Sequence, residues 1–331
     1  MDAVDQAAYD QELQGAQDSI YLLDLGIGTH NSDITKTSTA GRVLRFNRLN
    51  GKMTTLIDGQ SQPDGLDISR STGRLFWTNM GKSGAAFDGS VHSARLDGSD
   101  VRTVLPVGAV HTPKQLVVDD KSQRLYFCDR EGMGVHRVGF DGNNHELLVR
   151  TGSLSIPKER EDMTRWCVGI SIDVLHGYIY WTQKGPSKSG KGRIFRANLN
   201  IPPGQTADSR DDIELVLGNL PEPIDLDLDL DQDKQVLYWT DRGEHPFGCS
   251  VSKLDLKSGS SVDGRLNADA LRKEIVIIAR MFHEPIGLHL DLKQNVVYLA
   301  ELGGCIYQIT QEGTKTVLYE DDASYTGLNM L

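Results

Sequence analysis

The sequence has few cysteines, no long apolar run and no excess of basic residues. Its four cysteines show no CxxC spacing and no dense disulfide framework. No Asn-x-Ser/Thr glycosylation sequon occurs, and no apolar stretch approaches the roughly 20 residues that a membrane-spanning helix needs. These absences predict a soluble protein in a reducing, cytoplasmic environment.

The charge balance argues against two classes of partner. Over 331 residues the formal net charge is −11, and such a surface attracts neither nucleic-acid phosphates nor anionic lipids. We therefore expect no nucleic-acid partner and no membrane partner, and we expect a monomer. Residues 1–18 are acidic and polar and lack the basic start and apolar stretch of a secretion signal. They predict an N-terminal arm or short helix.

What the sequence does contain is a repeat. Six segments share an aromatic residue, two hydrophobic or threonine-like positions, and then an acid or amide. Their first residues are 55, 50, 54, 58 and 60 positions apart, and this regular spacing indicates a repeat architecture. The six segments are YLLD (Tyr21 to Asp24), FWTN (Phe76 to Asn79), YFCD (Tyr126 to Asp129), YWTQ (Tyr180 to Gln183), YWTD (Tyr238 to Asp241) and YLAE (Tyr298 to Glu301).

A second element precedes each of the last five segments by about ten residues. Apolar residues alternate there with small or polar ones, as in a strand that neighbours cover. After each aromatic segment come two more strand-like stretches, several joined by the hairpin pairs Asn50-Gly51, Asp97-Gly98 and Asp141-Gly142. Each unit therefore predicts a four-stranded antiparallel blade. The preceding elements are PDGLDIS (from Pro63), PKQLVVD (from Pro113), CVGISID (from Cys167), PIDLDLD (from Pro223) and PIGLHLD (from Pro285).

Six such blades predict an all-β fold, a six-bladed β-propeller over residues 19–331. The first unit lacks its inner strand, and the chain ends in YTGLNML, Tyr325 to Leu331. We expect this C-terminal strand to complete the N-terminal blade, because that closure removes the exposed sheet edges of an open array.

At these residues the chain resembles the YWTD-repeat six-bladed propeller of the low-density lipoprotein receptor family, class B type. The segments YWTD at Tyr238, LFWTN at Leu75 and IYWTQ at Ile179 are the closest matches. The resemblance covers nearly the whole chain and implies that the aromatic and Thr positions pack the blades together. It does not import receptor function, because one fold serves many functions.

The free-standing character of the chain is similar to that of YWTD-like propellers of fungi. That resemblance implies specialised metabolism, where some such proteins guide cycloadditions such as hetero-Diels–Alder reactions. It carries no diagnostic motif at particular residues.

One position of the inner strands is unusual for this kind of propeller. Two residues after the Gly position the six strands carry mostly charged, imidazole or amide groups where a small apolar residue is usual, and such groups are costly to bury unless hydrogen-bonded. Either they line a solvated channel, or they form a polar floor that holds a ligand or a proton carrier. In the second interpretation Asp67, Asp227 and His289 are the catalytic candidates. The full set is Asp67, Val117, Ser171, Asp227, His289 and Asn329.

Loops between the second and third strands of each blade, and those entering the next inner strand, should emerge on one face. This face collects histidines and large apolar side chains, which together predict a small-molecule pocket at the propeller mouth. Singly, each of these residues is more often a packing or surface residue. The substrate-binding candidates are His30, His111, Arg165, Trp166, His245, Phe247, Phe282, His283 and Tyr325, with Asn329 in the channel beneath.

Three cofactor-like motifs fail on inspection. GPSKSGKG (Gly185 to Gly192) resembles a phosphate-binding loop but lacks the Ser or Thr after its Lys. DLDLDLDQD (Asp225 to Asp233) lacks the Gly of a calcium loop, and GIGTHN (Gly26 to Asn31) lacks the third Gly of a dinucleotide fingerprint. We therefore expect no cofactor and assign no metal ligands.

These observations lead to a hypothesis about function. We expect a cofactor-independent enzyme that cyclises an apolar small molecule or natural-product intermediate by positioning and hydrogen bonding. Two alternatives remain open: a protein-interaction scaffold, and a metal-dependent hydrolase or lactonase, whose metal Asp67, Asp227 and His289 would hold.

Overall fold

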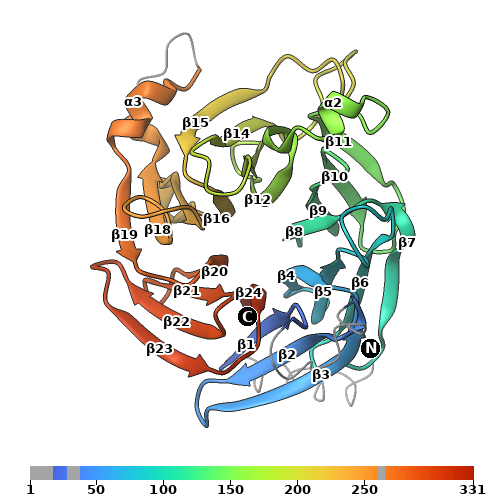
Figure 1. Ribbon diagram of the computed structural model, residues 1–331, viewed down its shortest axis with the longest axis vertical. Helices are drawn as coiled ribbons and strands as arrows, with labels where there is room; N and C mark the ends of the chain where they lie inside the picture. The colour runs from blue at the N-terminus through green and yellow to red at the C-terminus, as the bar shows by residue number, and fades with distance from the viewer. Residues whose placement is uncertain (1–17, 28–37, 260–264) are drawn as a thin grey trace.

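The computed structural model describes residues 18–27, 38–259 and 265–331. In these residues the strands form six four-stranded sheets arranged around a central axis (Figure 1), which confirms the predicted six-bladed propeller. The N-terminal arm predicted over residues 1–18 lies outside the described residues, except for Asp18.

In each of the first three blades the inner strand pairs with the strand that carries the aromatic motif. The strands of each blade are given in order from the axis outward. Blade 1 consists of β24 (Tyr325–Met330), β1 (Ser19–Asp24), β2 (Gly41–Asn47) and β3 (Lys52–Gln60). Blade 2 consists of β4 (Pro63–Ser69), β5 (Arg74–Asn79), β6 (Gly89–Arg95) and β7 (Arg102–Val110). Blade 3 consists of β8 (Pro113–Asp119), β9 (Arg124–Asp129), β10 (Gly134–Gly139) and β11 (Glu146–Arg150).

The last three blades repeat this order. Blade 4 consists of β12 (Cys167–Asp173), β13 (Tyr178–Gln183), β14 (Gly192–Asn198) and β15 (Glu214–Leu220). Blade 5 consists of β16 (Pro223–Asp229), β17 (Val236–Asp241), β18 (Ser250–Asp255) and β19 (Val276–Arg280). Blade 6 consists of β20 (Pro285–Asp291), β21 (Val296–Glu301), β22 (Cys305–Thr310) and β23 (Lys315–Glu320).

Short helices occupy some connections. Among the described residues, no helix has the length and apolar character that a membrane span requires. The side chain of Asn267 caps the longest of them by accepting a hydrogen bond from the Ala270 N–H. The helices are α2 (Pro157–Arg160), α3 (Ala268–Lys273), η2 (Met163–Arg165), η3 (Asp231–Asp233) and η4 (Leu256–Ser258).

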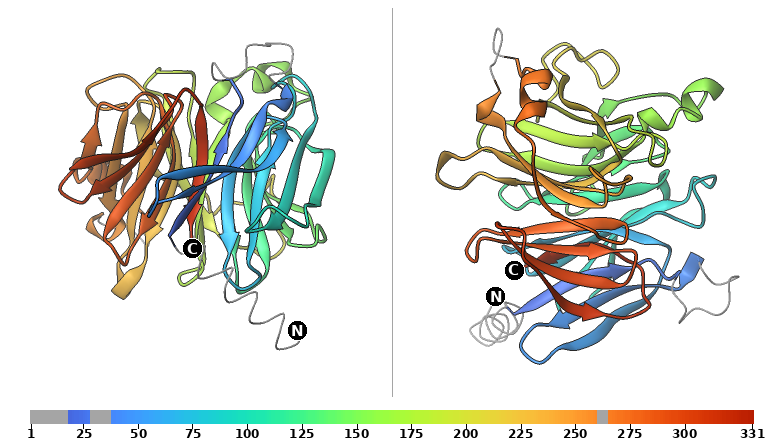
Figure 2. Two further views of the ribbon diagram at one scale, coloured as in Figure 1. Left: turned by 90° about the horizontal axis from the view of Figure 1, so that it is seen from below. Right: turned by 60° about the vertical axis from the view of Figure 1, so that its left-hand side comes forward.

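Seen from the side, the strands run between two faces (Figure 2). We call the face where the inner strands begin the entry face, and the face where they end the exit face. Each inner strand contacts the inner strands of the two neighbouring blades, so the six of them enclose a central channel. Entry-face loops carry the inter-blade crossings. Exit-face loops are the turns from each inner strand to the next strand outward and the connections from each third strand to the fourth.

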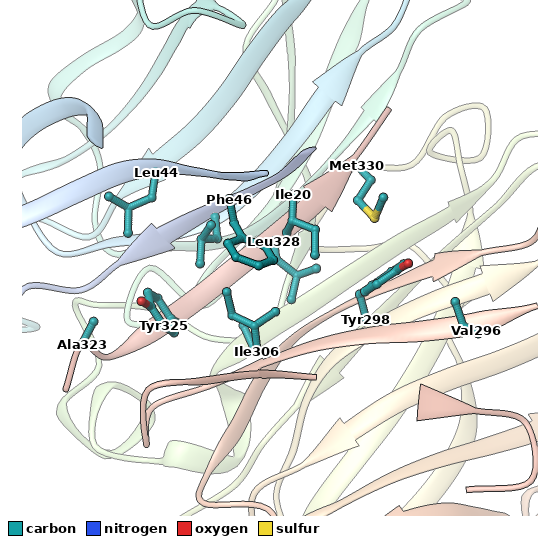
Figure 3. Packing of buried hydrophobic residues seen from close by; sticks show 12 residues of the cluster. Ile20, Leu44, Phe46, Val296, Tyr298, Ile306, Ala323, Tyr325, Leu328 and Met330 are labelled. Carbon is teal, nitrogen blue, oxygen red and sulfur yellow. The ribbon is translucent and has the colours of Figure 1, made fainter. Parts of the chain in front are cut away.

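Blade 1 closes the ring as predicted. The C-terminal strand β24 pairs antiparallel with β1, with Ile20 opposite Met330 and Leu22 opposite Leu328. Figure 3 shows the apolar cluster around this junction, to which blade 1 contributes Phe46 and blade 6 contributes Ile306. The sheet edge of β1 is therefore covered by pairing within the chain.

In the three blades whose motif contains a threonine, its side chain fastens that blade to the next one. In blade 4 the Thr182 hydroxyl accepts a hydrogen bond from Gly169 N–H (2.7 Å) and donates one to the Ile224 carbonyl of blade 5 (2.7 Å). Thr78 and Thr240 make the equivalent bridges in blades 2 and 5. The structural role that the family resemblance implies for this position is thus visible in the hydrogen bonds.

The inner-strand glycines allow the neighbouring inner strands to approach closely. A Cβ placed on Gly169 would lie 2.1 Å from the Ile224 carbonyl oxygen, and one on Gly287 would lie 2.3 Å from the Thr326 carbonyl oxygen. Such distances leave no room for a side chain. Between the blades, the aromatic residues of the motif form the core, with Trp77, Trp181 and Trp239 almost fully buried.

Candidate functional site

A cavity of about 800 Å³ opens at the exit face of the central channel. Its wall includes two of the three predicted catalytic residues, Asp227 and His289. Apolar side chains from β16, β20 and β24 alternate with charged groups from the exit-face turns, so the cavity has both apolar and polar walls. It is lined by Asp18, Arg48, Arg70, Asp227, Leu228, His289, Leu290, Asp291, Leu292, Lys293, Gln294, Met330 and Leu331.

The two aspartates each connect one inner strand to the next. The Asp67 carboxylate accepts hydrogen bonds from Ile68 N–H (2.6 Å) and from Val118 N–H of the neighbouring blade (2.7 Å). Asp227 repeats the pattern with Leu228 N–H (2.8 Å) and Leu290 N–H (3.1 Å). Backbone donors therefore hold both carboxylates at fixed positions in the channel wall.

Both carboxyl groups hold their protons more strongly than usual. Burial raises the pKa of Asp67 to about 7, against the lowering effect of its two backbone hydrogen bonds. Burial likewise raises the pKa of Asp227 to about 6, while Leu228 N–H, Leu290 N–H and the Arg70 charge act in the opposite direction. A pair of carboxyl groups that titrate near neutral pH can exchange protons with a bound molecule, and such groups cluster at functional sites.

His289 differs from the aspartates because its ring is available. Among the described residues no hydrogen bond reaches its imidazole, although the side chain lines the cavity. Burial, helped by the Arg70 charge, lowers the pKa of His289 to about 4. At neutral pH the ring is therefore uncharged and offers one N–H donor and one acceptor.

Asn329 completes this part of the channel. Its Nδ2 donates to the Asp67 carboxylate (2.7 Å), and its Oδ1 accepts from Met330 N–H (2.6 Å). Arg70, just after β4, donates to the Met330 carbonyl (3.2 Å). The structure thus brings Asp67, Asp227, His289 and Asn329 to one level of the channel, as the inner-strand alignment predicts.

The predicted mouth residues are arranged differently from the expected pocket. Phe282 is buried in the core, with its ring edge-on to Tyr307. Tyr325 is fully buried and donates its hydroxyl hydrogen bond to Asp321 (2.8 Å). His111 is buried as well, with its ring 2.8 Å from the Thr112 hydroxyl. These three side chains fill interior space and do not line the exit-face cavity.

The other predicted mouth residues do not converge either. His245, Phe247 and His283 are exposed on the entry face, and His30 lies outside the described residues. Arg165 lines a separate cavity between blades 3 and 4. Their predicted substrate roles therefore remain predictions.

The entry face instead carries paired charges that sequence reasoning missed. The buried Lys114 on β8 is ion-paired with Asp64 on the neighbouring inner strand β4. Burial lowers the pKa of Lys114 to about 8. Further around, Arg130 lies 5.4 Å from the centre of the Trp166 ring, and Lys184 Nζ lies 5.9 Å from it. The available signal for Arg130 and Lys184 is positional, because each directly follows the aromatic motif of its blade.

The charged residues of the exit-face cavity were also missed. Arg48, Arg70, Asp291 and Lys293 lie in or next to the turns that follow inner or third strands, positions that sequence reasoning treats as solvated loops. For Arg70, Asp291 and Lys293 the sequence offers one signal: they lie at or just after the ends of inner strands that carry polar channel residues. In the described part of the chain no group of three His, Cys, Asp or Glu side chains is arranged to hold a metal ion.

Comparison with known proteins identifies the relatives of the chain. No protein-family model matches it. Low-density lipoprotein receptor-related protein 1 of the fungus Pyricularia oryzae is 40% identical over 316 residues, which cover 94% of this chain and 97% of that protein. The chain belongs to the family of this fungal protein. The predicted resemblance to receptor-type YWTD propellers thus agrees with the name of a relative that matches over nearly its full length.

A second relative of this fungal family is longer. The 3-hydroxyacyl-CoA dehydrogenase-like protein LAM1 of Cochliobolus heterostrophus is 41% identical over 311 residues, 93% of this chain. The matched part is 64% of LAM1, so about a third of that protein has no counterpart here.

Solved structures show the fold of the family. A chain of the nidogen/laminin complex matches with a TM-score of 0.65 and 13% identity, over 94% of this chain and 97% of that one. The Pseudomonas aeruginosa periplasmic gluconolactonase PpgL matches with a TM-score of 0.56 and 15% identity, over 94% and 99%. At these identities the likeness concerns the propeller architecture alone, which is compatible with binding proteins and with enzymes.

Proposed function

We propose that the protein is a cofactor-independent enzyme that binds a small organic molecule in the exit-face cavity and promotes a cyclisation or cycloaddition there, such as a hetero-Diels–Alder reaction. The observation that carries this proposal is the His289 imidazole, which is neutral and lacks a partner among the described residues in a cavity of about 800 Å³. Small-molecule sites commonly have about this volume.

The cavity wall supplies the two things that such a reaction needs. Leu292 and Leu331 offer apolar surface to the hydrocarbon part of a substrate. Holding the reacting atoms in a near-attack geometry can lower the barrier by about 7–11 kcal/mol. No bond to the protein is required for this contribution.

Polar groups would act on the reacting carbonyl. The neutral His289 ring donates one hydrogen bond, which stabilises negative charge that develops on an oxygen in the transition state. Asp67 and Asp227, with pKa values of about 7 and 6, add proton transfer where the reaction requires it. Arg70 and Asn329 hold this group of side chains in place through their hydrogen bonds to β24 and Asp67.

Native mass spectrometry tests the proposal. The purified protein is incubated with an organic extract of a fungal culture and examined for a non-covalent small-molecule adduct. We expect an adduct with the wild type, with His289→Gln retaining it and losing turnover, and with His289→Phe losing it. Val107→Ser, an exposed change on β7, is the matched control and should behave as the wild type. The same adduct in all variants, or none in the wild type, would contradict the proposal.

A protein-interaction scaffold is the second candidate, and one observation favours it. Phe247 and Met281 are 63% and 71% exposed, and the Phe282 N–H to Cys249 carbonyl contact (3.4 Å) places their segments side by side. An exposed apolar patch of this kind can dock a partner. A stoichiometric protein partner that Phe247→Ser and Met281→Ser together abolish, with no small-molecule adduct, would establish this function instead.

A further inference from the structure

A second cavity of about 380 Å³ lies between blades 3 and 4, away from the exit-face site. Its charged lining consists of Arg150, Arg165, Arg193 and Asp162, three positive groups against one negative group. Arg150 is ion-paired with Asp208 (2.6 Å), and Arg165 lies 3.3 Å from Asp162 and 3.5 Å from Glu159. Arg193 is therefore the lining cation that has no ion pair among the described residues. Two of its residues, Trp181 and Arg193, lack partners that the equivalent residues of other blades have.

The first difference concerns the indole N–H of the motif tryptophan. In blade 2, Trp77 Nε1 donates to the Oε1 of Gln60 (2.8 Å), the residue opposite Gly41 at the end of β3. In blade 4 the equivalent Trp181 Nε1 is buried and has no partner in the described structure. The residue in the place of Gln60 is Arg150, opposite Gly134, and an arginine cannot accept a hydrogen bond.

The second difference concerns the arginine at the start of the third strand. In blade 1, Arg42 lies opposite Asp24 and donates to its carboxylate at 2.7 and 2.9 Å. In blade 4, Arg193 lies opposite the neutral Gln183, and no carboxylate of the described residues is within ion-pairing distance of its guanidinium. Its Nη2 donates to the Thr164 carbonyl (2.5 Å) and to Gln183 Oε1 (2.8 Å), whereas its Nε is buried without a hydrogen-bond partner.

The first difference removes an acceptor and the second removes a negative charge, and both concern residues that line one cavity. Leaving a buried donor unsatisfied is costly. Trp181 Nε1, Arg193 Nε and Arg165 Nε are three such donors on residues that line this one cavity. Apolar walls from Phe195 and Ile213 complete the space, with the Phe195 ring stacked on Trp181 at 5.6 Å. Asp162 on the lining disfavours a dianion more than a monoanion.

We propose that this cavity is a binding site for a small organic carboxylate, whose oxygens accept from Trp181 Nε1 and Arg193 Nε and whose apolar body lies against Phe195. The ligand would supply the acceptor that Gln60 supplies in blade 2 and the negative charge that Asp24 supplies in blade 1. The site is independent of the function proposed for the exit-face cavity.

Nuclear magnetic resonance of the indole N–H groups tests the site on the intact protein. The chain has four tryptophans, and Trp181→Phe assigns the Trp181 signal. Benzoate should shift this signal downfield in a saturable way, whereas the uncharged benzamide should not. Inorganic phosphate should have a weaker effect than benzoate. The His289→Phe variant, altered in the other cavity, should bind benzoate as the wild type does.

Two variants separate the proposed contacts from general charge effects. Arg193→Gln should weaken benzoate binding by about 10- to 100-fold, the range for a hydrogen bond to a charged group. Arg150→Gln places a potential acceptor near Trp181, as in blade 2, and should raise the melting temperature while it weakens benzoate binding. Arg280→Gln removes the same charge from an exposed position on β19 and should leave binding unchanged.

Several results would overturn the proposal. An unchanged Trp181 signal in the folded wild type with benzoate would do so, as would equal responses to benzamide and benzoate. An equal or stronger response to phosphate would refute the assignment to an organic carboxylate. Equal weakening by Arg193→Gln and Arg280→Gln would show that only net charge matters.

Discussion

Asp67, Asp227 and His289 occupy the same position of three inner strands, yet their surroundings give them different chemistry. Backbone N–H groups of neighbouring blades hold the two carboxylates. No described residue holds the imidazole. Burial raises the pKa of the acids and lowers that of the histidine, because in each case the uncharged form is favoured. The ring available to a ligand is therefore the neutral one.

The protonation state of His289 can be measured directly. Its pKa is lowered to about 4, so its ring C–H resonance should stay constant from pH 8 to about pH 5 and move only near pH 4. Because the folded-state pKa lies below the ordinary histidine value of 6.5, the neutral ring's contribution to stability is lost as pH falls from about 6.5 to 4. His289→Gln identifies the resonance, and titration near pH 6.5 would show that the ring is solvated.

The Lys114–Asp64 pair makes a second prediction at this scale. Both residues are buried, and Gln115 Nε2 also donates to Asp64 (3.2 Å). Lys114→Met alone should destabilise the protein by about 3–5 kcal/mol in urea unfolding, because it leaves a buried carboxylate without its cation. The double variant with Asp64→Leu should recover most of that loss. Equal losses in the single and double variants would show that packing dominates there.

The types of residue in the channel could be predicted from the sequence, but their partners could not. Aligning the inner strands places Asp67, Asp227, His289 and Asn329 at one level, because the two-residue periodicity of a strand fixes the side to which each side chain points. Which side chains bond to backbone N–H groups depends on the relative register of adjacent blades. The entry-face prediction was less successful because Phe282 and Tyr325 turn into the core, where burial of an aromatic ring is favourable.

At the level of elements, the motif threonines connect strands of neighbouring blades. The repeats in the sequence predict these strands but not the connections between them. Thr182 satisfies Gly169 N–H and the Ile224 carbonyl, which belong to two different sheets. The blades are therefore joined by directional bonds in addition to apolar packing. Repeat spacing predicted the strands well, since six copies constrain one another, whereas the inter-blade hydrogen bonds needed coordinates.

Thr182→Val tests this connection with little change in shape. We expect a loss of about 2–4 kcal/mol in the free energy of unfolding, because a buried N–H and a buried carbonyl both lose their partner. Thr55→Val, at an exposed position on β3, should change stability by less than about 0.5 kcal/mol. Similar small effects of both substitutions in urea unfolding would mean that packing alone holds the blades together.

For the whole molecule, closure of the ring rests on β24. Deletion of residues 325–331 should abolish cooperative thermal unfolding and cause self-association, since it exposes the edge of β1 and the apolar cluster at Leu22 and Phe46. Adding the peptide of residues 325–331 should restore a sharp transition by strand addition. A monodisperse deletion variant with an unchanged melting curve would contradict this.

The pairing of β24 with β1 also sets an order of events during synthesis. The ribosome releases Ser19–Asp24 hundreds of residues before Tyr325–Met330, so the nascent chain carries an incomplete blade for most of translation. Domains usually fold in the order in which they are made, but here the earliest blade must wait for the latest strand. We therefore expect the growing chain to be a chaperone client until β24 emerges.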